Sequence, residues 1–335
     1  MPATNVQWPP PLTRFPTLWP GQFGVPGTDH DRGERMHSTG EVFYVDPNYP
    51  GASDARDGTS PTSPLLTVAA ALTKVQPQRG DVIVVGSNDY WQYAPGGKAV
   101  STDYITPITE EVTIPYTCSG VRIVGASNGP MGVMWQPASN GGTCITVHAI
   151  DVLIEGFLFT EGDYTGCNAI YAEWDGTTLF GENLTVRHCT FDGTVDIAIQ
   201  LEYCWYCDIH DNAFWECDAY GIYTDAGGAA CDFCYIHDNL FRDCGTSAIA
   251  LLGAANKNHI YNNQIYNSSA MAGGAATDEG IDLTAGNGNF VYNNAFSCAL
   301  PAGAPGDYDD LNTGGVSSAW IANWCMNGMA TTNPT

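Results

Sequence analysis

Short alternations of apolar and polar residues recur along most of this chain, and three segments show the full pattern. Each begins with an aliphatic residue and closes five positions later with phenylalanine: Val186–Phe191, Ile209–Phe214 and Ile236–Phe241. Thirteen residues after each aliphatic residue lies the centre of a second apolar stretch, at Ile199, Ile222 and Ile249. Because side chains alternate between the two faces of a strand, this pattern predicts short β-strands with one buried face.

The same unit recurs in both directions along the chain. Its opening aliphatic residues are Ile123, Ile154, Val186, Ile209, Ile236, Ile260, Val291 and Ile321. Successive opening residues lie 31, 32, 23, 27, 24, 31 and 30 positions apart. A unit of this size cannot bury its apolar face alone, so neighbouring units must stack. The pattern therefore predicts a solenoid in which each unit forms one coil.

Three positions after the opening residue, an asparagine recurs in four units. These residues are Asn212, Asn239, Asn263 and Asn294. Asparagine tolerates the backbone conformation of a tight corner, and its amide can bond the asparagine of the next coil. We expect the four side chains to lie in one column, within hydrogen-bonding reach of one another.

The repeated unit, of the form V-x-I-x-x-N-x-F, and its asparagine corner resemble the right-handed parallel β-helix proteins of the pectate-lyase-like type. The resemblance extends over roughly residues 43–325. It implies an all-β fold, a right-handed parallel β-helix. That fold carries lyases, hydrolases, phage tailspikes and structural virion proteins, so the resemblance does not decide the function.

Changes in composition predict four parts of the chain. Residues 1–42 form an extended arm, 43–91 an N-terminal cap with the first rung, 92–325 the β-helix and 326–335 a C-terminal tail. A short amphipathic helix in the cap would cover the open end of the core, which is otherwise an unpaired sheet edge.

The predicted capping helix has recognisable start and stop signals. Ser63 is placed to cap its N-terminus, Pro64 is its first residue, and the helix Leu65–Val75 ends before Pro77. At the other end of the solenoid, the segment from Pro301 onward is expected to close the core.

The arm combines frequent prolines with aromatic residues. Its aromatic side chains are Trp8, Phe15, Trp19 and Phe23. Prolines keep such a chain extended, which suits a segment that lies on a partner surface. A disordered tail is the alternative interpretation. We expect the arm to be an attachment device with the four aromatic residues as anchors.

The charge of the chain disfavours several classes of binding partner. The chain has 11 basic and 36 acidic residues, giving a net charge of −25. This excess disfavours nucleic acid and anionic membranes, and it would require bridging Ca²⁺ for an acidic polysaccharide to bind. No stretch is long and apolar enough to cross a bilayer, and Met1–Trp8 lacks the features of a secretory signal peptide.

Twelve cysteines raise the question of metal binding or disulfides. Cys204 and Cys207 form one C-x-x-C pair, Cys231 and Cys234 a second, as in some zinc sites. Both pairs occupy equivalent coil positions, and Cys207 and Cys234 fall in an inward slot that holds Val or Leu in other units. Stacked buried thiols are therefore the favoured interpretation, with vertical disulfides and zinc as alternatives.

A polar column is predicted on the outer face of the opening strands. It contains Glu155, Arg187, His210, His237, Tyr261 and Tyr292. Asp211 and Asp238 follow the two histidines, so a metal site is conceivable there. Because the residue types in the column do not repeat, we interpret it as a solvated face and predict no metal site.

Three carboxylates form the strongest candidate for catalysis. Glu173, Glu202 and Asp225 recur at one outward position, beside a column of Tyr171, Gln200 and Tyr223. Rungs ~4.8 Å apart would bring adjacent carboxylates to distances that glycosidases use. The Asn-Thr-Asp, Gly-His-Gly and Arg-Ile-Lys motifs of polygalacturonases and the Asp-Pro-His-Asp motif of alginate epimerases are absent. In so acidic a chain a chance column is the simpler interpretation.

These observations favour a structural protein on the surface of a virion, without catalytic residues or cofactor. The expected role is a capsid decoration (cement) protein or a spike of a tailed bacteriophage. The expected partners are the major capsid protein or another virion protein, and further copies of this chain in a homotrimer. The alternatives are a tailspike-like polysaccharide hydrolase that uses Glu173, Glu202 and Asp225, and an extracellular adhesin or structural layer protein.

Overall fold

The structure of the protein is a computed structural model. It describes residues 40–86, 107–126, 133–174, 181–193, 195–225, 230–266, 280–283, 286–297 and 318–325. The proposed anchors Trp8, Phe15, Trp19 and Phe23, nearly all of the predicted arm and the whole predicted tail lie outside the described residues.

Three long parallel sheets form the walls of a solenoid. The first contains, in order along the solenoid, β1 (Val42–Val45), β2 (Val82–Gly86), β5 (Arg122–Ala126), β8 (Leu153–Glu155), β11 (Thr185–Arg187), β15 (Asp208–His210), β19 (Tyr235–His237), β22 (His259–Tyr261), β25 (Phe290–Tyr292) and β27 (Ala319–Ile321). The second contains β3 (Ile108–Thr109), β6 (Val133–Gln136), β9 (Phe157–Phe159), β12 (Thr190–Asp192), β16 (Ala213–Trp215), β20 (Leu240–Arg242), β23 (Gln264–Tyr266), β26 (Ala295–Ser297) and β28 (Trp324–Cys325).

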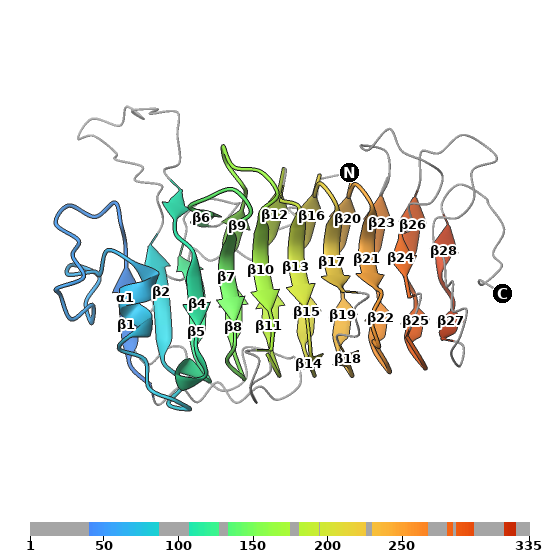
Figure 1. Cartoon of the computed structure of the whole chain (residues 1–335), viewed down its shortest axis with the longest axis horizontal. Coiled ribbons are helices and arrows are strands. Elements are labelled where there is room, and N and C mark those ends of the chain that lie inside the picture. Colours follow the sequence, from blue (N-terminus) through green and yellow to red (C-terminus); the bar gives the residue numbers. More distant parts are fainter. Residues whose placement is uncertain are drawn as a thin grey trace, which may run out of the picture.

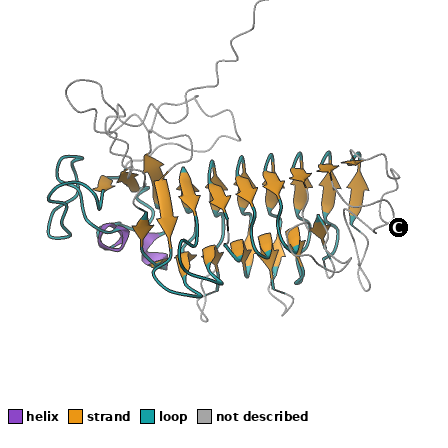
Figure 2. Ribbon diagram, turned by 90° about the horizontal axis from the view of Figure 1, so that it is seen from above, coloured by secondary structure: helices purple, strands orange, loops and turns teal. Residues whose placement is uncertain are grey.

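The third sheet contains β4 (Val112–Ile114), β7 (Thr143–Val147), β10 (Asn168–Ala172), β13 (Ile197–Leu201), β17 (Tyr220–Thr224), β21 (Ser247–Leu251) and β24 (Ile281–Asp282). A short pair, β14 (Cys204–Trp205) with β18 (Cys231–Asp232), lies between the third and first sheets along the chain. Figures 1 and 2 show the coils stacked side by side along the long axis.

Equivalent positions of successive repeats pair directly, which is why the sequence repeat and the coil coincide. Ile209 pairs with Ile236 in the first sheet, and Phe214 pairs with Phe241 in the second. In the third sheet, Ile222 pairs with Ile249. The predicted all-β parallel β-helix is confirmed.

The core is a set of vertical stacks of like side chains. Phe159, Phe191, Phe214 and Phe241 stack nearly flat, with ring centroids 5.3, 4.7 and 4.4 Å apart, and all four are fully buried. Truncating one such ring to alanine costs about 3–5 kcal/mol in a typical core. These stacks hold adjacent coils in register.

The asparagine corner forms a continuous hydrogen-bonded ladder between the first and second sheets. Each asparagine donates its backbone N–H and its side-chain Nδ2 to the Oδ1 of the asparagine on the next coil. The ladder runs from Asn212 through Asn239, Asn263 and Asn294 to Asn323. Asn323 is a member that the sequence pattern did not identify, because the last coil opens at Trp320, which pairs with Val291; the prediction that it opens at Ile321 is wrong. A second ladder joins Asn258 to Asn289, and Asn258 in turn accepts from the Cys234 backbone.

The cysteines with described side chains are ten buried free thiols. Cys207 and Cys234 are fully buried and face inward, as the alternation predicts. The Sγ atoms of Cys231 and Cys234 are 3.5 Å apart. Among the described residues, no three or more His, Cys, Asp or Glu side chains are grouped so as to hold a metal ion.

The N-terminal helix is shorter than predicted. Helix α1 spans Val68–Leu72, and its cap is Thr67, whose hydroxyl accepts a hydrogen bond from the Ala70 backbone. The prediction that Ser63 caps the helix and that Pro64 is its first residue is wrong, because Leu65 is extended and bridges to Val45 of β1. Glu110 completes the helix start by accepting hydrogen bonds from the Val68 and Ala69 backbone.

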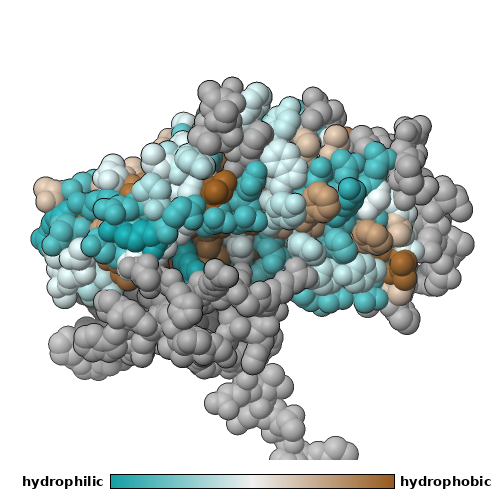
Figure 3. Space-filling model, turned by 90° about the horizontal axis from the view of Figure 1, so that it is seen from below, coloured by the Kyte–Doolittle hydropathy of each residue, from teal (hydrophilic) through white to brown (hydrophobic). Residues whose placement is uncertain are grey.

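A short 3₁₀-helix spans Tyr116–Cys118, and no helix in the described part of the chain has the length and apolar character needed to cross a bilayer. The face shown in Figure 3 is mainly hydrophilic over the described residues, with apolar side chains scattered among them. Polar side chains are therefore spread over the outside of the coils.

Candidate functional site

The acidic column predicted from the sequence lies on the outer face of the third sheet. Ala172 pairs with Leu201, so the residues that follow them, Glu173 and Glu202, lie side by side on adjacent coils. On the next coil, Tyr223 pairs with Gln200, which places Asp225 beside Glu202. The structure thus brings the three carboxylates together in one column.

Neighbouring side chains already bind two of these carboxylates. His148 Nε2 lies 2.7 Å from Glu173 Oε1, and Gln200 Nε2 donates to Glu202 Oε1 over 3.2 Å. Burial, followed by hydrogen bonding to the Glu202 carboxylate, raises the pKa of Tyr171 well above its ordinary value. Tyr171 therefore stays protonated and serves as a hydrogen-bond donor to the acids. The third carboxylate, Asp225, is exposed.

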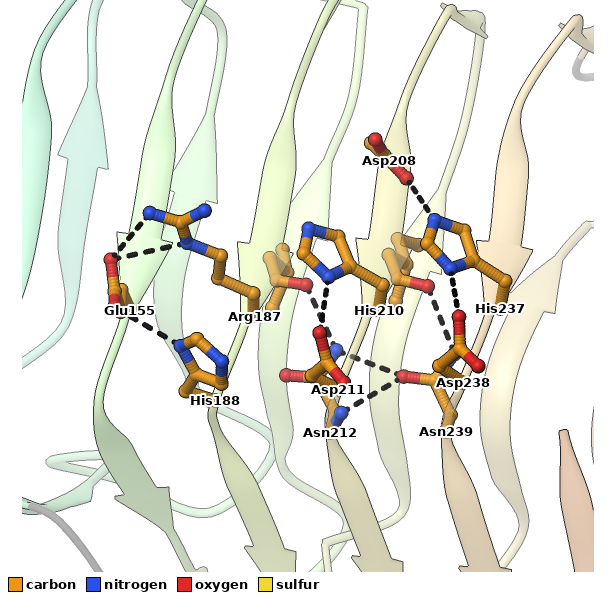
Figure 4. Close-up of polar contacts among 12 residues, drawn as sticks. Glu155, Arg187, His188, Asp208, His210, Asp211, Asn212, His237, Asp238 and Asn239 are labelled. Carbon is orange, nitrogen blue, oxygen red and sulfur yellow. Dashed lines mark hydrogen bonds and ion pairs between the residues drawn. The ribbon is translucent and has the colours of Figure 1, made fainter. Parts of the chain in front are cut away.

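A second cluster of polar side chains lies on the outer face of the first sheet, along the corner with the second (Figure 4). Arg187, His210 and His237 occupy equivalent positions on successive coils. Their exposed fractions are 4%, 3% and 8%, and Glu155 on the preceding coil is 9% exposed. The interpretation of this column as a solvated face is therefore wrong for these four residues, while Tyr261 and Tyr292 are half-buried.

Ring stacking contributes to the burial of the two histidines. His210 and His237 lie parallel with centroids 5.0 Å apart, and His237 stacks on Tyr261 at 4.6 Å. Tyr261 stacks in turn on Tyr292 at 4.9 Å. Each ring covers the faces of its neighbours, so side chains that point outward are nevertheless withdrawn from water.

Carboxylates hold both imidazoles by their edges. His210 Nδ1 lies 2.8 Å from Asp211 Oδ2, and His237 Nδ1 lies 2.7 Å from Asp238 Oδ2. The other nitrogen of His237, Nε2, lies 3.0 Å from Asp208 Oδ1. An ionised carboxylate only accepts hydrogen bonds, so bonds at both nitrogens require His237 to be protonated.

The pKa of His237 agrees with this geometry. Burial on its own would lower the pKa, but the hydrogen bonds to Asp208 and Asp238 outweigh burial and raise it above the ordinary imidazole value. The hydrogen bond from His210 lowers the pKa of Asp211, which therefore remains ionised. The column thus contains charged pairs that link neighbouring coils.

A related group lies one coil further toward the N-terminus. Glu155 Oε2 accepts from Arg187 Nε and Nη2, both at 3.2 Å, and Glu155 Oε1 lies 3.1 Å from His188 Nδ1. Burial would raise the pKa of Glu155, but the bond from His188 and the charge of Arg187 hold it below the usual range. The bond to Glu155 correspondingly raises the pKa of His188.

A signal for this cluster was present in the sequence. The dipeptide His-Asp occurs at 210–211 and again at 237–238, at the same coil position. A repeated pair of this kind indicates that the two residue types act together. The repeat does not predict that Asp208 binds His237, nor that the column is buried. Alternation gives the direction in which a side chain points, but not whether neighbouring side chains bury it.

Comparisons with known proteins agree with the observed fold. A family model described as the right-handed β-helix region matches residues 131–296. No curated protein sequence matches the chain.

Solved structures that resemble the chain have different functions. A lacto-N-biosidase from Eubacterium ramulus is 10% identical with a TM-score of 0.48; the match covers 85% of this chain and 56% of that one. ORF18 of Geobacillus virus E2 is 11% identical with a TM-score of 0.39, covering 85% and 62%. The surface adhesin PfbA of Streptococcus pneumoniae is 12% identical with a TM-score of 0.39, covering 73% and 68%.

Proposed function

The chain belongs to the right-handed parallel β-helix superfamily, and on that premise we propose that it is a structural protein of a virus particle. Its proposed role is that of a capsid decoration (cement) protein or a spike on the virion surface of a tailed bacteriophage. It is bound to the major capsid protein or another virion protein and assembled as a homotrimer.

The observation that carries this proposal is the pairing of outward polar side chains from coil to coil. Glu155 binds Arg187 on the next coil, and Asp208 binds His237 on the next. In the third sheet, His148 binds Glu173 on the following coil. In each of these three pairs, the polar groups are directed at a neighbouring coil. Such links favour a rigid rod, which loses little conformational entropy on assembly.

The overall charge suits a protein on the outside of a particle. A net charge of −25 keeps an exposed surface soluble and discourages binding to nucleic acid. The charge alone does not attach the protein to anything. Attachment is the proposed role of the arm, residues 1–42, whose sequence combines prolines with the four aromatic residues Trp8, Phe15, Trp19 and Phe23.

The proposal is tested by removing or mutating the arm and measuring binding to virus particles. Truncation before Gly40 should leave a soluble β-rich protein that no longer binds particles of the encoding phage prepared without this chain. Within the full-length protein, Trp8→Ala with Trp19→Ala should weaken binding roughly 10³-fold, since two buried aromatic anchors contribute ~2 kcal/mol each. Thr13→Ala with Thr17→Ala, in the same arm, is the matched control. Binding is measured by co-sedimentation; full occupancy by the truncated protein would refute the proposal.

One feature favours a polysaccharide hydrolase as the second candidate. Glu173, Glu202 and Asp225 lie on adjacent coils at ~4.8 Å spacing, which is close to the carboxylate separation in retaining glycosidases. Against it, His148 and Gln200 already bind two of the three carboxylates. The adhesin alternative would use the same rigid rod, and loss of particle binding on truncation separates it from the virion role.

A further inference from the structure

A groove of about 450 Å³ follows the outer side of the corner between the first and second sheets. It crosses four successive coils and is lined by His188, Cys189, Thr190, Asp211, Asn212, Ala213, Asp238, Asn239, Leu240, Asn262 and Gln264. We refer to it as the corner groove. It lies beside the histidine pairs of Figure 4 and is distinct from the acidic column of the third sheet.

Each of the four coils contributes two outward side chains to the corner groove. One set follows the corner itself, where the backbone has positive φ: His188, Asp211, Asp238 and Asn262. The other set begins the strands of the second sheet and pairs in register: Thr190, Ala213, Leu240 and Gln264. The groove is therefore a repeated feature of the coil and not a gap left by one loop.

Two carboxylates form the centre of one wall. Asp211 and Asp238 each use Oδ2 to accept from a histidine, and Oδ1 of each accepts no hydrogen bond within the described residues. Their side chains are 47% and 46% exposed, so these oxygens can meet a ligand. Adjacent coils are ~4.8 Å apart, which spaces the two carboxylates so that one guanidinium can reach both.

The floor opposite these carboxylates is apolar at its centre. Ala213 and Leu240 lie between Thr190 at one end and Gln264 at the other. A ligand that fits must offer an apolar stem and a cationic head. Lysine and arginine side chains combine these two parts. An anionic ligand is disfavoured by the two aspartates and by the net charge of −25.

Each nearby basic group is already bound to an acidic side chain. Arg187 and His188 are both bound to Glu155, on the coil that precedes them. His210 and His237 bind Oδ2 of the aspartates, and Asp208 supplies His237 with a further negative charge. These four basic groups match Glu155, Asp208, Asp211 and Asp238 in number and do not exceed them, and Oδ1 of Asp211 and of Asp238 remains available to a ligand.

We propose that the corner groove is a docking site for a basic segment of a partner protein. In the bound state, the stem of an arginine or lysine side chain lies over Ala213 and Leu240, and its charged head donates hydrogen bonds to Oδ1 of Asp211 and Asp238. The proposal does not depend on the virion role, because it rests only on the groove and its charges.

The test uses the full chain and a fluorescein-labelled Gly-Arg-Gly-Arg-Gly peptide, with a citrulline peptide of the same length as the neutral probe. Asp211→Asn with Asp238→Asn should weaken binding at least 10-fold in fluorescence anisotropy. The matched control is Asp57→Asn with Asp163→Asn, two exposed acids outside the groove, which makes the same change in net charge and should weaken binding less than 2-fold.

A second variant separates shape from charge. Ala213→Leu fills the floor without altering any charge and should weaken binding at least 5-fold, while circular dichroism verifies that each variant is folded. Equal losses in the groove and control pairs, several peptides bound per chain, or equal binding of the citrulline peptide would each overturn the proposal. Binding of a neutral oligosaccharide that Ala213→Leu abolishes, without arginine-peptide binding, would also overturn it.

Discussion

Replacing Asn239 by alanine tests whether the asparagine ladder stabilises the coils. Asn239 is 2% exposed and makes four side-chain hydrogen bonds. Its Oδ1 accepts from the backbone N–H and from Nδ2 of Asn212, both at 3.1 Å. Its Nδ2 donates to the Ile209 carbonyl at 2.9 Å and to Asn263 Oδ1 at 3.0 Å. Alanine therefore leaves two buried donors of Asn212 without an acceptor.

The expected loss of stability follows from those two donors. A buried polar group left without a partner costs ~1–3 kcal/mol, so Asn239→Ala should lower the free energy of unfolding by about 3 kcal/mol or more. Asn323→Ala is the matched control, because it removes the same kind of bonds to Asn294 at the end of the ladder. Asn323 is partly exposed, so water can replace the lost acceptor and the expected loss is only about 1 kcal/mol.

Urea unfolding followed by circular dichroism gives the free energies, and hydrogen exchange locates the effect. The Asn212 backbone N–H donates to Asn239 Oδ1, so its protection should fall sharply in Asn239→Ala. Protection of the Asn294 N–H should be unchanged in that variant. If Asn239→Ala is no more destabilising than Asn323→Ala, or if the Asn212 N–H stays protected, the ladder does not stabilise the coils in this way.

Two further variants test the clusters on the outer faces. The raised pKa of His237 stabilises the fold fully below the ordinary imidazole pKa near ~6.5, and this contribution is lost as the pH rises through the folded-state value. The unfolding free energy of the wild type should therefore decline relative to His237→Gln over this range, and parallel pH profiles would contradict the protonated pairing with Asp208 and Asp238. Glu202→Gln should leave particle binding unchanged, and the wild type should release no reducing ends from host surface polysaccharide. Release that Glu202→Gln abolishes would establish the hydrolase instead.

The sequence is most informative where one coil repeats the next. Phe214 and Phe241 stack because they hold the same position in parallel coils, and Asn212 and Asn239 bond for the same reason. In a parallel solenoid, equal position in the repeat means direct contact, so a local pattern predicts a three-dimensional one. The fold and the asparagine column could be predicted for this reason alone.

The sequence predicts two features less well: the start of the helix that precedes the repeats, and the burial of side chains that point outward. The helix was expected from Leu65, but that residue pairs with β1 and delays the helix to Val68. Helix propensity and capping signals in the sequence favour the earlier start, but the bridge between Leu65 and Val45 outweighs them. For His210 and His237, alternation gave the correct outward direction, while their burial depends on ring stacking along the column.

The small number of basic residues in the chain indicates which chemical groups a binding partner must supply. Of the 11, Arg79, Arg187 and Arg242 are held in ion pairs with neighbouring acids. The 36 acidic residues outnumber the lysines and arginines by 25. A partner can be attracted to such a protein by apolar contact or by positive charge of its own. The proposed arm, with its aromatic residues, suits attachment by apolar contact, and the corner groove suits attachment by positive charge. For a partner that uses both, variants in the arm and in the groove should each weaken binding of that partner, and their losses of binding free energy should add.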